Sequence, residues 1–319
     1  MKTEAPVRLG IAKEWPSRKR VIGWLDKMTP WTMDQAIAYN NGVELGPGPV
    51  RTLPTASYGP VGHRANVRAE VLALKGKPWE HAMAEALGYQ LFGHQLSFFW
   101  HRQFRLLFPD RPQPLRLMNW EGMTEVMAMS IVIGWTERGV YQAYLTHAAL
   151  NRGYQLVLSY ESRHRCAHAF MLRLIAAYKG DMSHEWPSFA QTEPIYEFIL
   201  EQWSASDPDL LVPWLLAACD RHTHQAKPDT QKAFWDCSSF PQTPLEILLL
   251  FRLRSLIGLK NPQLEHPLMA SPFDRAAIQQ PDYIPDALMM ATLNRVREDW
   301  PEFDRRLSLE EIRDQEFFT

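Results

Sequence analysis

Apolar residues recur at helical spacing from about residue 63 nearly to the end of the chain, which predicts a mostly α-helical protein. Alternating β-branched runs with hairpin turns, which indicate strands, are scarce. The expected fold is therefore a compact array of many helices. The helices are expected over 64–75, 78–108, 120–133, 137–152, 160–178, 194–203, 208–222, 244–257, 285–299 and 309–316, with a break in the second left open at Gly88 or Gly93.

The first 62 residues are predicted to form an irregular N-terminal arm ahead of a helical body over 63–319. Two short helices fit 15–27 and 32–39. The stretch GVELGPGPVRTLPTASYGPVG then interrupts regular structure repeatedly with glycine and proline. A subdivision of the body near 153–159 stays open, because the charge balance changes sign there.

The helix expected over 244–257 is apolar on almost every side, so we predict that it is central. Thr243, Pro244 and Glu246 fit the N-cap, first and third positions of a capping box. Gly258 fits the residue that follows a helix end. The start and the end of this helix are therefore expected to be encoded locally.

Two arginines interrupt this apolar helix. Arg252 and Arg254 project about 160° apart, so each needs a partner of its own. A buried cation without a partner costs several kcal/mol. We expect buried carboxylates such as Asp220 or Asp236 to pair with these arginines.

Charge is unevenly divided along the chain, although the net charge is only −2. Residues 1–160 carry 18 Lys and Arg against 12 Asp and Glu, a balance of +6, whereas 161–319 carry 16 against 24, a balance of −8. The segment 180–220 contains eight acidic residues and no lysine or arginine. Such a surface repels nucleic acid and attracts basic protein.

The sequence also bears on the compartment. Its start lacks an apolar signal segment, and no apolar run approaches the roughly 20 residues that cross a bilayer. Three cysteines without CxxC spacing fit a reducing environment. We therefore expect a cytoplasmic protein that binds neither membrane nor nucleic acid.

One short run, YESRHRCAH, contains the residue types of a metal site. Glu161, His164 and His168 lie near one helical face, but a di-iron bundle needs a second such motif and further glutamates. Zinc needs at least three well-placed ligands, and the charges of Arg163 and Arg165 disfavour a cation nearby. Structural histidines are the favoured interpretation, and a helical metal-dependent enzyme is the alternative.

Motifs for other chemistry are missing. The sequence contains no Gly-x-Ser-x-Gly elbow, no Walker loop, no Gly-x-Gly-x-x-Gly and no His-Glu-x-x-His. Cys166 lies beside basic residues that would lower the pKa of its thiol if they converged, but a small helix-face residue is favoured. The run DRHTHQ, with His222 and His224, is interpreted as a polar helix end. We expect no catalytic residue and no cofactor.

The acidic segment offers the best candidate for a binding surface. Three glutamates spaced by four lie along one side of the helix expected over 194–203, and two aspartates follow it. An ordinary solvated face and a surface for a basic partner are both open interpretations. The five carboxylates are Glu193, Glu197, Glu201, Asp207 and Asp209.

Two stretches, LLAACDRHTHQA and TPLEILLLFRLRSLIGLKNPQLEHPLM, resemble the C-terminal pattern of helical immunity proteins that neutralise bacterial antagonistic toxins. The resemblance is greatest to the family paired with PoNe-type DNase effectors, as found in type VI secretion and polymorphic toxin systems. It covers roughly residues 155–275. Structural roles are assigned to Glu246, Arg252, Arg254 and His266.

The resemblance implies an all-helical, cytosolic, non-enzymatic protein that binds its cognate toxin. A basic nuclease is the expected toxin, because a nuclease must attract phosphate, and the five carboxylates of the acidic segment are the expected contact. Whether the chain forms a homodimer stays open. The alternative, from a different class, is the metal-dependent enzyme built on Glu161, His164 and His168.

Overall fold

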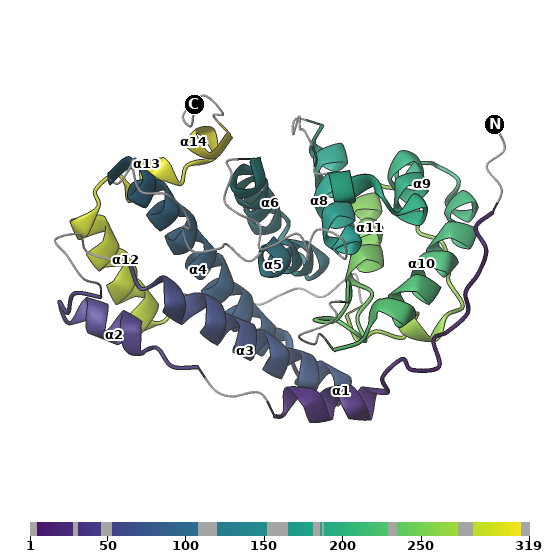
Figure 1. Ribbon diagram of the computed structural model, residues 1–319, viewed down its shortest axis with the longest axis horizontal. Helices are drawn as coiled ribbons and strands as arrows, with labels where there is room; N and C mark the ends of the chain where they lie inside the picture. The colour runs from purple at the N-terminus through teal and green to yellow at the C-terminus, as the bar shows by residue number, and fades with distance from the viewer. Residues whose placement is uncertain are drawn as a thin grey trace. The chain divides into compact units, whose positions relative to one another are not determined.

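The computed structural model describes residues 5–27, 31–45, 53–107, 120–151, 165–180, 186, 188–228, 235–273 and 283–313. These residues form thirteen α-helices and three short 3-10 helices, with no strand among them (Figure 1). The predicted helical fold class is therefore confirmed. The expected boundary at 153–159 lies outside the described residues.

Contacts divide the chain into two compact units. Unit 1 comprises Met1–Trp24, Met127–Ala143 and Val157–Gln279. Unit 2 comprises Leu25–Val126, Tyr144–Leu156 and Gln280–Thr319. Residues of α5 (Trp120–Val132) and α6 (Thr136–Asn151) contribute to both units.

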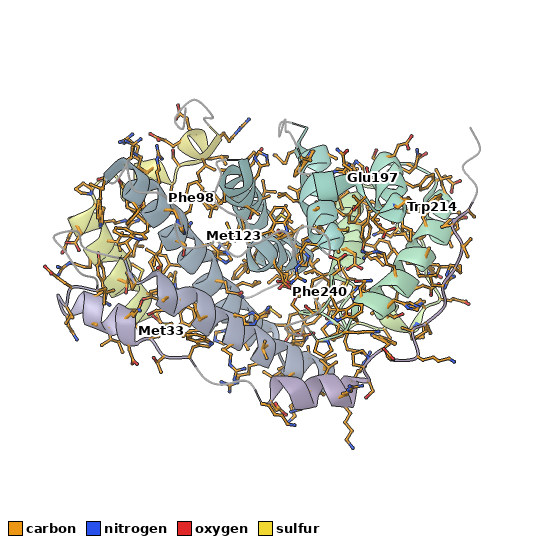
Figure 2. All side chains as sticks on the ribbon, in the orientation of Figure 1. Met33, Phe98, Met123, Glu197, Trp214 and Phe240 are labelled. Atoms are coloured by element: carbon orange, nitrogen blue, oxygen red, sulfur yellow. The ribbon has the colours of Figure 1, made fainter. Side chains whose placement is uncertain are left out.

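Unit 2 is built around two long helices, α3 and α4, which lie against each other (Figure 1). Buried apolar residues, including Phe98 of α4 (Figure 2), fill its core. The α2 helix packs on α12. The helices of this unit are α2 (Asp34–Asn40), α3 (Thr55–Leu74), α4 (Glu80–Leu107), α12 (Ala287–Asp299), α13 (Phe303–Arg306) and α14 (Leu309–Arg313).

The break that the sequence left open at Gly88 or Gly93 does not occur, because α4 runs unbroken. A Cβ on Gly93 would lie 2.5 Å from the backbone nitrogen of Gly59 on α3, so this glycine serves close helix packing. The helix predicted to begin at residue 64, after an irregular segment, begins earlier than expected. The α3 helix begins at Thr55 and contains Pro60, since burial of its first turns offsets the lost backbone hydrogen bond.

Unit 1 holds the charged residues singled out from the sequence. Its α8 packs on α9 and α11, and α9 packs on α10. Two stacked ring pairs join α9 to α8 and α10: Phe170 on Tyr196, with centroids 4.7 Å apart, and Phe198 on Trp214, at 4.0 Å. The elements are α1 (Arg18–Leu25), α8 (Cys166–Lys179), η1 (Ser188–Gln191), α9 (Pro194–Gln202), η2 (Pro208–Leu211), α10 (Val212–Gln225), α11 (Leu245–Leu256) and η3 (Pro267–Met269).

Of the two predicted ends of α11, the C-terminal one is confirmed and the N-terminal one is not. Gly258 has φ of +78°, and Leu259 N donates to Arg254 O at 2.9 Å, so the predicted glycine termination is confirmed. The capping box predicted at the start of α11 is wrong. Pro244 occupies the N-cap position without a side-chain hydrogen bond. The carboxylate of Glu246 instead contacts His222.

Candidate functional site

Three consecutive residues of α10, Asp220, Arg221 and His222, each enter a different buried polar network. Successive helical residues project about 100° apart, so one turn of helix serves three directions. All three residues are buried. The run DRHTHQ does lie at the end of α10, as predicted, but His222 is buried there, with a side chain that is 0% exposed.

Asp220 fastens the N-terminal segment of the chain to α10. Its carboxylate accepts hydrogen bonds from Arg8 Nε at 2.5 Å and from Gly10 N at 2.9 Å. His266 Nε2 lies 3.3 Å away. Because His266 Nδ1 accepts from Leu268 N at 3.1 Å, Nε2 is the nitrogen that donates to Asp220. Burial would raise the pKa of Asp220, but the Arg8 and Gly10 hydrogen bonds outweigh it and lower that pKa.

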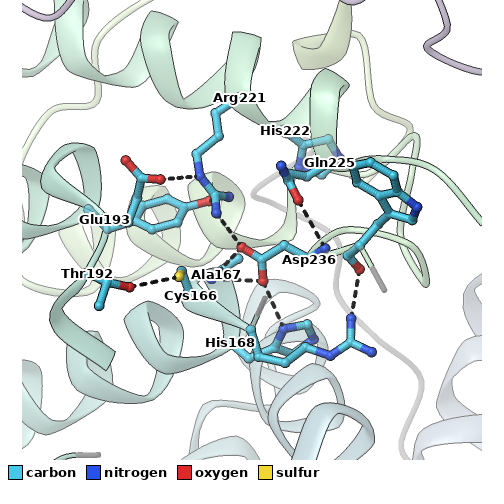
Figure 3. Close-up of polar contacts among 12 residues, drawn as sticks. Cys166, Ala167, His168, Thr192, Glu193, Arg221, His222, Gln225 and Asp236 are labelled. Atoms are coloured by element: carbon cyan, nitrogen blue, oxygen red, sulfur yellow. Dashed lines mark hydrogen bonds and ion pairs between the residues drawn. The ribbon is translucent and has the colours of Figure 1, made fainter. Parts of the chain in front are cut away.

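Arg221 joins two carboxylates from different parts of unit 1 (Figure 3). Its Nη2 lies 2.7 Å from Asp236 Oδ2, and its Nε lies 2.7 Å from Glu193 Oε2. The guanidinium also lies over the ring of Tyr196, 5.0 Å from the centroid. Asp236 is fully buried, and it accepts from Ala167 N at the first turn of α8 at 3.0 Å. Burial would raise the pKa of Asp236, but the charge of Arg221 holds it below its ordinary value.

His222 contacts the glutamate at the start of α11. Its Nδ1 lies 2.8 Å from Glu246 Oε1, and both side chains are 0% exposed. Cys237, from the segment between α10 and α11, is buried beside them. Phe240 lies against the imidazole, with ring centroids 5.7 Å apart. This network is therefore shielded from solvent.

The prediction that buried carboxylates pair with the arginines of α11 is wrong for Arg254. Its guanidinium is buried, and it donates to three backbone carbonyls: Trp203 O at 2.6 Å, Ala205 O at 3.0 Å and Lys260 O at 2.7 Å. Carbonyls at a helix C-terminus have no partner within the helix and carry partial negative charge, so Arg254 closes the end of α9. Arg252 is only partly buried.

The five acidic residues of the predicted surface separate into two groups. Glu193 and Glu197 are paired inside unit 1. Glu193 caps α9 and bonds to Arg221, while both Glu197 oxygens contact Arg173 of α8, Oε2 at 2.8 Å from Nη2. The exposed group comprises Glu201, Asp207 and Asp209.

The alternative metal residues are only partly described. Glu161 and His164 lie outside the described residues. His168 is fully buried, with Nδ1 3.6 Å from Asp236 Oδ1. The neighbouring Cys166 is not activated, because burial, followed by the charge of Asp236, raises the pKa of its thiol.

Some of these partners were outside the reach of sequence reasoning. Arg173 neutralises Glu197 from another helix, 24 residues away in the chain. Arg221 was visible only as part of a polar helix end, and no periodicity links it to Asp236. The local signal in the sequence was Asp236, an acidic residue within the run of turn residues WDCSSFPQT.

Comparisons with family models, curated proteins and solved structures found no significant match to this chain. No helix in the described part of the chain has the length and apolar character needed to cross a membrane.

Proposed function

We propose that the chain is an immunity-type protein that binds and neutralises a cognate antibacterial toxin in the cytoplasm. The observation that carries the proposal is the group of exposed carboxylates Glu201, Asp207 and Asp209, which follow one another along the end of α9 and the start of η2. No lysine or arginine occurs between residues 180 and 220 to neutralise them locally. A basic nuclease domain has the complementary charge.

The ion pairs of Glu193 and Glu197 limit the proposed binding surface to the three exposed acids. Glu193 and Glu197 are held by Arg221 and Arg173, so their charge is largely balanced. Long-range attraction of a cationic partner therefore depends on the three exposed acids. The paired glutamates stabilise the packing of unit 1, and the unpaired surface carboxylates attract the partner over a distance.

The platform beneath the exposed acids is well packed. The Phe198 and Trp214 rings stack with an interplanar angle of 13°, and Arg254 ties the residues that follow α9 to α11. Figure 2 marks Glu197 and Trp214 in this region of unit 1. A rigid surface loses less conformational entropy on binding than a mobile one. Leu210, 43% exposed between these acids and α10, adds an apolar contact.

The direct test uses the protein encoded by the reading frame adjacent to this gene. That protein is expressed in cells with and without the chain, and its catalytic domain is purified for binding measurements. We expect a cationic toxin domain, a stable complex with the chain, and growth of cells that express both proteins. A toxic neighbour that neither binds the chain nor is neutralised by it would contradict the proposal.

A further inference from the structure

Three buried side chains in unit 1 have the composition and the spacing of a metal site. His222 comes from α10, Cys237 from the segment between the helices, and Glu246 from the first turn of α11. One ligand atom from each lies within 4.8 Å of the other two. All three side chains are buried.

Two polar atoms of this cluster lack protein partners within the described residues. His222 Nδ1 contacts Glu246 Oε1, but His222 Nε2 and Glu246 Oε2 are buried and have no hydrogen bond there. Buried polar atoms are nearly always satisfied. Two such atoms in one contacting pair point to a ligand that binds lone pairs.

The third member supplies sulfur. Cys237 is fully buried, and burial together with the charge of Glu246 raises the pKa of its thiol. A divalent cation would reverse that preference, because metal binding displaces the thiol proton. One thiolate, one carboxylate and one neutral imidazole together balance two positive charges, and the fourth position of a tetrahedral zinc site is then left for a water molecule.

We propose that His222, Cys237 and Glu246 bind a zinc ion that ties α10 to the start of α11. Nitrogen, sulfur and oxygen ligands of this kind are typical of Zn²⁺. When the ion binds, a Zn–S bond forms and the proton of Cys237 passes to solvent. The ion stabilises unit 1 and does not depend on the proposed toxin binding.

The first experiment adds zinc chloride to the metal-free full-length protein and then removes unbound metal by desalting. We expect one zinc per chain and a higher midpoint of thermal unfolding. Cys237→Ala should weaken zinc binding by at least about tenfold, since changes to residues that only support a metal's ligands already cost that much. A wild-type protein that retains no zinc would overturn the proposal.

Matched controls lie on the same helix. Cys219 of α10 is fully buried, as Cys237 is, and His224 of α10 is a partly exposed histidine that bonds Gly10 O. Cys219→Ala and His224→Ala should keep one zinc, whereas Cys237→Ala and His222→Ala should lose it. Equal zinc binding in all four variants would overturn the assignment.

A measurement on the wild-type protein covers the case in which the Cys237 or His222 variants fail to fold. X-ray absorption at the zinc edge should detect a sulfur ligand. It separates this site from the alternative built on Glu161, His164 and His168, which contains no sulfur. Bound zinc with only nitrogen and oxygen ligands would contradict the proposal.

Discussion

Arg221 Nη2 lies 2.7 Å from Asp236 Oδ2, and this buried ion pair joins α10 to the segment that precedes α11. The same carboxylate accepts the backbone N–H of Ala167, so α8 is held at the same point. Three segments distant in sequence therefore meet at one fully buried acid.

Removing the charge of Asp236 should strongly destabilise unit 1. Asp236→Ala leaves Arg221 buried beside Tyr196 without this partner, and breaking a buried pair from one side costs about 3–5 kcal/mol. Urea unfolding followed by tryptophan fluorescence measures the loss. Asp304→Ala, which breaks the exposed pair with Arg297, is the control and should change stability little. Equal effects would show that the Asp236 network is not a structural centre.

Acid should weaken the attachment of the N-terminal segment through Asp220. The pKa of Asp220 is lowered in the folded protein, whereas an unfolded Asp titrates at about 3.9. Its stabilising contribution is therefore fully present above about pH 4 and is lost as the pH falls through the lower folded value. Asp220→Asn should be less stable than wild type at neutral pH, and the gap should narrow in acid. Unfolding free energies measured across a pH series give both curves, and parallel curves would rule out this role.

Replacing the buried arginine of α11 should loosen the end of α9. Arg254→Met leaves three carbonyls without their donor. Trp203 and Ala205 are partly buried and Lys260 is exposed, so water can reach some of these carbonyls, and a loss of about 1–3 kcal/mol is expected. Arg252→Met, at a partly exposed position of the same helix, should have a smaller effect. Thermal unfolding of the two variants compares them directly, and a larger effect at Arg252 would refute the capping role of Arg254.

Because α3 packs closely on α4, alanine substitutions at Gly93 and Gly59 should change the stability of unit 2 differently. Gly93→Ala places a Cβ 2.5 Å from Gly59 N, so unit 2 should lose about 1–3 kcal/mol through overpacking. Gly59→Ala meets nothing within 4 Å. It should be neutral or should stabilise the helix by about 0.5–1 kcal/mol. Denaturant midpoints of the two variants in the opposite order would show that the helices are not packed closely there.

Much of the helical order follows from local sequence. Pro194 in the first turn of α9 and Asp207 as the cap of η2 lie where polar caps and proline predict helix starts. Gly258 ends α11 for the same local reason. The start of α3 is different. In the sequence Pro60 argues against a helix at this position, and the helix forms because tertiary packing stabilises it.

The candidate site was predictable only in part. A spacing of four identified Glu193, Glu197 and Glu201 as one stripe, but only Glu201 stays exposed, because arginines of α8 and α10 reach the other two. Periodicity describes one helix and carries no information about its neighbours. For the same reason the carbonyl partners of Arg254, about 50 residues earlier in the chain, could not be anticipated.

The central claim is that Glu201 and its neighbouring exposed acids steer a basic toxin to this surface. The decisive measurement is the association rate of the purified toxin domain across a salt series, for wild type and for Glu201→Lys/Asp209→Lys. Glu265→Lys/Glu298→Lys, at two other exposed positions, is the charge-matched control. We predict wild-type and control rates well above the unsteered range of about 10⁵–10⁶ M⁻¹s⁻¹, falling with salt, and a slower, flatter profile for the first variant. Identical profiles for all three proteins would contradict the claim.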